Sequence, residues 1–250
     1  MSFIFIKLRT RAQSKHNRVL MSDNNVMKLT KHGHACLEFE LGGERLLLDP
    51  GFYSEPMGNT ENVVAIVITH QHDDHCFEGQ LDAIIATQLA AGRPAPKIYS
   101  VDEVCARLAK SAESRGTSYD TMAVHHGDFI ETGPFTLEFF GDMHAEIHRS
   151  IPLVQNCGVM VNGKLYYPGD SYTQPDRAVE VLAVPTSAPW LKIGDVIDFV
   201  AAVKPRRSFA THNALLSDFG HALNNGRVQS TTEAGGGAFT YLQVGDSLEV

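Results

Sequence analysis

Residues 70–75, with the sequence His-Gln-His-Asp-Asp-His, constrain this chain more than any other segment. They directly follow residues 63–69, a continuous β-branched run of the kind that forms a strand buried on both faces. Alternate side chains of an extended segment point to the same side, so His70 and His72 can reach one cation. If the chain then turns into a helix, Asp74 and His75 can face a second position nearby. A solvated loop would explain one histidine, but four metal-competent side chains within six residues predict a metal site.

Three later positions repeat this placement, because each follows a short apolar strand and precedes a loop. They are His144, Asp170 and His212. Loops at strand ends are where layered α/β folds gather functional groups, so these residues are candidates for completing a two-metal site. His148, four residues beyond His144, is an alternative ligand if the strand ends later; otherwise we expect it to contact the substrate or the ligands. Three imidazoles beside a carboxylate suit zinc, or another borderline divalent metal, better than calcium or magnesium.

From residue 27 onward the pattern predicts alternating strands and helices. Gly42-Gly43 and Asn162-Gly163 indicate hairpin turns, the second of type I′. Ser100 is the expected N-cap of a helix over residues 101–112. The expected strands are 37–41, 45–49, 63–69, 135–140, 159–161, 164–167, 208–211 and much of 235–250, and the other expected helices are 81–91 and 193–204.

The length of 250 residues and the 43% hydrophobic content predict one globular domain over residues 27–250. Residues 1–26 are expected to be a flexible tail, since residues 1–20 carry five basic residues and no acid. The remainder sets 16 basic against 29 acidic residues, which argues against nucleic acid as a partner. No apolar run approaches the length of a membrane span and no export signal is evident. Four cysteines without a close pair favour a reduced, cytoplasmic protein.

The candidate ligands, together with the Tyr-Pro-Gly-Asp-Ser segment at 167–171, resemble the metallo-β-lactamase superfamily. Within it, the spacing is most similar to the branch of small metal-dependent hydrolases that includes ascorbate-6-phosphate lactonase. The resemblance implies a four-layer αββα sandwich of the α/β (α+β) class, with the metals at one edge of two sheets. It also implies that Asp49, at the end of an early strand, supports the site from beside the metals. The implied ligands are His70, His72 and His144 for the first ion, Asp74, His75 and His212 for the second, and Asp170 between the two.

The implied activity is dinuclear metal-dependent hydrolysis of a small, anionic ester, lactone or phosphoester by a metal-bridging hydroxide. Asp74, Asp49 and His148 are the expected catalytic residues, with Asp74 passing a proton to the leaving group. The expected cofactors are two divalent ions, Zn²⁺ first and Mn²⁺ or Fe²⁺ as alternatives. A thioesterase or phosphodiesterase of the same fold, or a non-catalytic metal-stabilised binding protein, remains open.

A small-molecule substrate is the expected partner, with neither nucleic acid nor membrane, and an exposed sheet edge could pair two copies of the chain. Three loops, 52–61, 114–119 and 186–192, the last with Trp190, are expected to set substrate specificity. His32 and His34 could line the mouth of the pocket, but a surface position is expected first. His125 and His126 are expected in an exposed turn.

Overall fold

The computed structural model describes residues 26–58 and 60–250, so the predicted tail lies outside the described residues except for Val26. Two seven-stranded mixed sheets and four helices make up the described part of the chain. The first sheet is antiparallel from β14 to β3 and parallel from β3 to β6. Its strands, in spatial order, are β14 (Ser247–Glu249), β1 (Lys28–Lys31), β2 (Leu37–Leu41), β3 (Glu44–Leu48), β4 (Val63–Ile68), β5 (Lys97–Ser100) and β6 (Thr121–Ala123).

The second sheet is parallel from β13 to β10 and antiparallel from β10 to β7. Its strands, in spatial order, are β13 (Ala238–Phe239), β12 (Arg207–Thr211), β11 (Val181–Pro185), β10 (Leu165–Tyr167), β9 (Gly158–Val161), β8 (Phe135–Phe140) and β7 (Phe129–Thr132).

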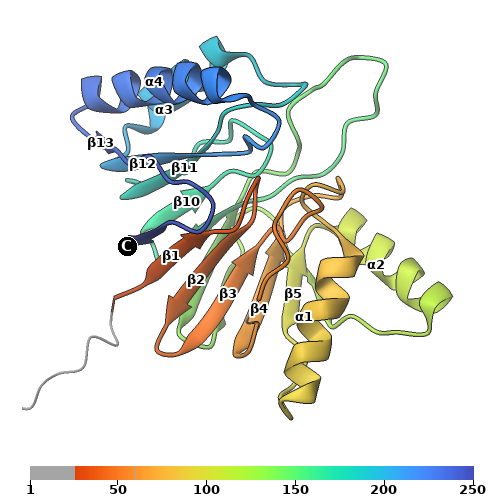
Figure 1. Cartoon of the computed structure of the whole chain (residues 1–250). Helices are drawn as coiled ribbons and strands as arrows, with labels where there is room; N and C mark the ends of the chain where they lie inside the picture. Colours follow the sequence, from red (N-terminus) through yellow and green to blue (C-terminus); the bar gives the residue numbers. More distant parts are fainter. Residues whose placement is uncertain (1–25, 59) are drawn as a thin grey trace, which may run out of the picture.

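The helices form the two outer layers: α1 (Glu78–Ala90) and α2 (Asp102–Arg115) accompany the first sheet, and α3 (Ile193–Val203) and α4 (Asp218–Ala234) cover the second (Figure 1). Strand β11 shows the layering residue by residue. Val181 and Ala183 belong to the core between the sheets, whereas Leu182 and Val184 pack in a second cluster with α3. This alternation follows from the two-residue period of a strand and explains why β11 is apolar throughout. The expected αββα sandwich is confirmed.

Strand direction brings the candidate residues to one edge. In the first sheet β1, β3 and β4 run the same way, and in the second sheet β8, β10 and β12 do. The carboxyl ends of these six strands are followed, within four residues, by histidine or aspartate. Those residues are His34, Asp49, His70, His144, Asp170 and His212, in the order of the strands β1, β3, β4, β8, β10 and β12.

Most of the expected elements are present, and both glycine hairpins are confirmed: Asn162 and Gly163 each have positive φ, as a type I′ turn requires. Ser100 as N-cap is wrong, because it ends β5 and its hydroxyl donates to the Ile68 carbonyl, while Val101 takes the cap position. The long strand expected over 235–250 is also wrong, because only β13 and β14 form there. None of the helices in the described part of the chain is long and apolar enough to cross a membrane.

Candidate metal centre

The first of two clusters at the sheet edge contains His70, His72, His144 and Asp170, whose ligand atoms all lie within 4.8 Å of one another. His70 Nε2 is 3.0 Å from His72 Nδ1, and His144 Nε2 is 3.4 Å from Asp170 Oδ2. Ligand atoms that share a tetrahedral zinc ion at bond lengths of about 2.0–2.1 Å are about 3.3 Å apart. The spacing of these atoms therefore fits a common cation.

The second cluster contains His34, Asp74, His75 and His212, again within 4.8 Å. Asp74 Oδ2 lies 3.4 Å from His212 Nε2 and 4.0 Å from His75 Nε2. Asp170 connects the two clusters, since its Oδ1 is 3.2 Å from His75 Nε2 and its Oδ2 is 3.1 Å from His212 Nε2. The structure thus brings together all seven predicted ligands, with Asp170 in the intermediate position that bridging requires.

Hydrogen bonds at the outer ring nitrogens determine which nitrogens can bind a cation. Nδ1 of His75 donates to Asp49 Oδ2 at 2.6 Å, and Nδ1 of His144 and of His212 donate to the carbonyls of Ala145 and Ser187, each at 2.5 Å. Because Nδ1 carries the proton, each Nε2 presents a lone pair to the cluster.

These inward atoms have no hydrogen-bond partner within the described residues: Nε2 of His75, His144 and His212, and Oδ1 of Asp170, are all buried and unpaired. Leaving a buried polar atom unpaired costs about 1–3 kcal/mol. Lone pairs of imidazole and carboxylate that face each other at 3 Å also repel unless a positive charge lies between them. The residues present therefore fit divalent ions at both clusters.

Asp49 anchors the centre from behind. Its carboxylate is fully buried and accepts four hydrogen bonds, from the Thr69 amide at 2.7 Å, the Thr69 hydroxyl at 2.7 Å, His75 Nδ1 at 2.6 Å and the Tyr167 hydroxyl at 2.9 Å. Thr69 Oγ1 in turn lies 3.0 Å from His70 Nδ1, so it accepts that proton while donating to Asp49. One carboxylate therefore orients a histidine of each cluster, as its predicted supporting position requires.

His34 was expected at the surface, and that expectation is wrong: the side chain is fully buried inside the second cluster. Its proton lies on the opposite nitrogen from that of His75, His144 and His212. The amide of Ala214 donates to His34 Nδ1 at 3.1 Å, so neutral His34 carries its proton on Nε2, 3.3 Å from Asp74 Oδ2. His34 therefore donates to Asp74 instead of presenting a lone pair. Its position just after a strand, shared with the predicted ligands, was the signal that could have found it.

Trp190 is a second residue that contacts the centre, and no sequence pattern predicted this contact. Its indole Nε1 donates to Asp170 Oδ2 at 2.8 Å, and its ring packs against His144 at a centroid distance of 5.8 Å. The loop that was expected to set specificity thus also holds the carboxylate of Asp170.

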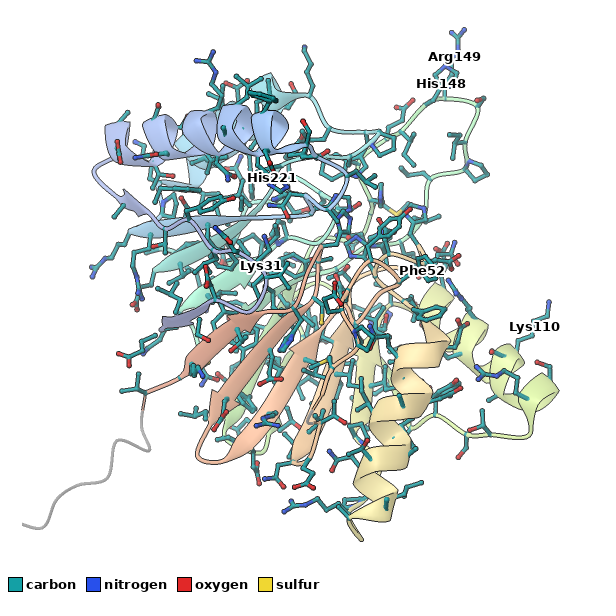
Figure 2. All side chains as sticks on the ribbon, in the orientation of Figure 1. Lys31, Phe52, Lys110, His148, Arg149 and His221 are labelled. Atoms are coloured by element: carbon teal, nitrogen blue, oxygen red, sulfur yellow. The ribbon has the colours of Figure 1, made fainter. Side chains whose placement is uncertain are left out.

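His148 is not brought to either cluster. It is exposed near the tip of the loop that follows His144, beside Arg149, and its Nδ1 is 2.7 Å from Ser150 Oγ (Figure 2). Its catalytic role stays a prediction, and the structure gives it no contact with the predicted ligands.

Burial and neighbouring charges shift the pKa values of His75, His212 and Asp170. Burial lowers the pKa of His75, but Asp170 and Asp49 outweigh burial and raise it well above its ordinary value. Burial likewise lowers the pKa of His212, and Asp170 and Asp74 reverse this and raise it to about 9. Burial raises the pKa of Asp170, but His75 and His212 bring it well below its ordinary value. Ions that bind here therefore compete with protons for the same lone pairs.

Two clusters of imidazoles and carboxylates at the edge of a four-layer sandwich define a metal-dependent hydrolase of the metallo-β-lactamase fold. A family model described as "Beta-lactamase superfamily domain" matches residues 28–212, and the chain belongs to this superfamily. The chain is 34% identical over 211 residues to Protein Rv0786c of Mycobacterium tuberculosis, which covers 82% of this chain and 93% of that protein. It is 30% identical over 183 residues to a UPF0173 metal-dependent hydrolase of Xanthobacter autotrophicus, covering 68% of this chain and 72% of that protein.

Solved structures share the fold at low sequence identity. The metallo-beta-lactamase fold protein YhfI from Bacillus subtilis matches 90% of this chain and 100% of its own, with a TM-score of 0.66 and 16% identity. A diphosphatase from the PhnP family matches 90% of this chain and 98% of its own, with a TM-score of 0.68 and 16% identity.

Proposed function

We propose that the chain hydrolyses a small, anionic ester, lactone or phosphoester at a centre of two divalent ions. The observation that carries this proposal is the set of buried, unpaired Nε2 atoms of His75, His144 and His212 that face Asp170 across the two clusters. His70, His72 and His144 would hold one ion and Asp74, His75 and His212 the other, with Asp170 bound to both.

Two such ions supply activated water near neutral pH and polarise an oxygen of the substrate. Asp74 is the predicted ligand carboxylate that reaches solvent, with 23% of its side chain exposed, whereas Asp170 is almost fully buried. Burial raises the pKa of Asp74, but the neighbouring rings of His212 and His34 lower it well below its ordinary value. An ionised carboxylate at the opening is placed to accept a proton and return it to the leaving group.

Charge favours an anionic substrate. Two divalent ions would carry four positive charges, and the three carboxylates of Asp49, Asp74 and Asp170 offset three of them. Before the bound water loses its proton, the loaded centre would keep one net positive charge, which attracts a carboxylate or phosphate group. Zinc is the ion we propose first, because imidazole is the main donor. The 16 basic against 29 acidic residues after residue 20 argue against nucleic acid as a partner. A kinship with the ascorbate-6-phosphate lactonase branch is part of this proposal, since a lactone is one of the substrate classes it names.

Metal analysis of the purified protein tests the proposal, followed by assays on lactones, carboxylic esters, thioesters and phosphodiesters. We expect close to two zinc, manganese or iron ions per chain. His72→Ala should lose metal and reduce hydrolysis at least about 100-fold. The exposed His125 offers a matched control, so His125→Ala should behave as the native protein. Hydrolysis that survives complete removal of both ions would contradict the proposal.

A further inference from the structure

A cavity of about 440 Å³ lies between the loop that follows β3 and the first turns of α1. Its volume is in the range of small-molecule sites. Its walls are largely apolar, and none of the described residues that line it carries a charge. Its apolar walls include the side chains of Phe52, Pro56, Met57, Phe77, Ala83 and Ile84.

This cavity adjoins a smaller hollow at Asp74 of the metal centre. Phe52 and Phe77 line the cavity and also border the smaller hollow that contains Asp73 and Asp74. The backbone joins the two places, because the Phe52 amide donates to the Asp73 carbonyl at 2.8 Å. The cavity is therefore close enough to Asp74 for one molecule to reach both places.

Aromatic rings line the passage from the cavity to the centre. The Phe77 and Phe52 rings meet edge-on with centroids 5.2 Å apart, Phe52 is 5.8 Å from Tyr53, and Tyr53 is 5.4 Å from His34. Phe52 is 60% exposed and Tyr53 is 45% exposed, although both flank a concave site. Covering such rings with an apolar group contributes about 25 cal/mol per Å² buried.

Gly79 shapes the entrance of the cavity. A Cβ at this position would lie 2.8 Å from Cε1 of Phe77, closer than such atoms approach. The glycine therefore lets the Phe77 ring lie over the first turn of α1, where it forms a wall of the cavity.

The opposite side of the centre has a different character. A second cavity, of about 500 Å³, is lined by His34 and Tyr53 and by the charged or titratable side chains of Lys31, Asp218 and His221. Figure 2 shows Lys31 and His221 on the side of β1 and α4, away from Phe52, which lies beside α1. The two sides of the centre thus differ in the polarity of their walls.

We propose that the α1 cavity is a specificity site for an uncharged apolar group, alkyl or aryl, of the molecule hydrolysed at the metals. This inference rests on the proposed function, and it narrows the substrate class to anions that carry such a group. We expect part of the substrate to occupy the cavity, because the cavity has the size of a ligand site and shares Phe52 and Phe77 with the hollow at Asp74.

Binding of two carboxylates to the metal-loaded protein tests this inference, with acetate and 4-phenylbutanoate as probes measured by titration calorimetry. Both offer the same anion, but only the second carries an apolar group. We expect 4-phenylbutanoate to bind at least about 10-fold more tightly than acetate, since each buried methylene contributes about 0.8 kcal/mol.

The matched variants are Ala83→Trp and Ala86→Trp. Both alanines are exposed on α1, but only Ala83 lines the cavity. Ala83→Trp should abolish the 10-fold preference while metal content and acetate binding stay native, and Ala86→Trp should keep the preference. Equal affinities for the two probes in the native protein, or a preference that survives Ala83→Trp, would overturn the inference. Binding needs no turnover, so a protein that binds with this preference but hydrolyses nothing would refute only the proposed function.

Discussion

Among the residues of the centre, the position of a single ring proton separates ligand from donor. The outer nitrogens of His75, His144 and His212 meet oxygen acceptors, whereas the outer nitrogen of His34 meets the amide of Ala214. All four residues are histidine, so only the groups around each ring determine which nitrogen carries the proton. At this scale a sequence names candidates but does not assign their protonation. For His75, His212 and His34 the deciding group comes from a segment distant in the sequence.

Asp49→Asn tests whether this outer layer tunes the metals. The amide keeps the size of the carboxylate, but its nitrogen cannot accept the protons of His75, Thr69 and Tyr167. We expect metal affinity to fall by about 10- to 100-fold, as measured by competition with a chromophoric chelator. Glu38→Gln is the matched control, because Glu38 is also mostly buried but pairs with His32 and Arg45, away from the metals. Native affinity in Asp49→Asn would show that the carboxylate is dispensable.

At the scale of elements, the turn after β10 places Asp170 through a close backbone approach. Gly169 has φ +62°, and a Cβ there would meet Asn156 Oδ1 and lie 2.8 Å from Thr69 Cβ. Asn156 uses that same oxygen to accept the Asp170 amide at 3.0 Å, and its Nδ2 donates to the Pro168 carbonyl at 3.0 Å. The glycine thus allows Asn156 to hold the bridging residue in place.

Gly169→Ala should therefore lower the free energy of unfolding by more than the strain of a positive φ alone would. Gly163 has φ +63° with open space around it, so Gly163→Ala isolates the conformational cost of about 1 kcal/mol. We expect Gly169→Ala to exceed that loss in urea unfolding and also to lower the metal content, which Gly163→Ala should leave unchanged. Equal losses of stability with full metal content in both variants would be inconsistent with a positioning role for this turn.

The helices and strands also show which parts of the fold could be predicted from sequence patterns. Strands such as Phe135–Phe140 and hairpins at Asn162-Gly163 were predictable because their signals are local. Helix α4 was not predicted, since Gly220, Gly226 and a low hydrophobic contrast hide its period, and its packing on β12 and β13 stabilises it instead. Of the centre, the ligand residues were predictable from recurring strand ends, whereas His34 and Trp190 contribute through contacts that only the folded chain creates.

The effect of metal ions on the stability of the whole molecule should depend on pH. Without metal, the raised pKa of His212, about 9, means that its pairing with Asp170 stabilises the folded state fully below pH 6.5 and is lost as pH rises through 9. Metal binding instead requires the unprotonated ring. We therefore expect the increase in Tm on adding zinc to be larger at pH 8.5 than at pH 6.5, as measured by differential scanning calorimetry after chelator treatment. An increase independent of pH would mean that no proton is displaced.

Ligands for both clusters come from both sheets: His70, His72, Asp74 and His75 follow β4, whereas His144, Asp170 and His212 follow strands of the second sheet. Because of this division, metal binding should depend on the order in which these residues are synthesised. While the chain is being synthesised, the first four predicted ligands emerge well before the last three, so an ion bound early would meet an incomplete set and would exchange readily. Retention of two ions would then require that the two sheets have docked, and a bound ion would oppose their separation.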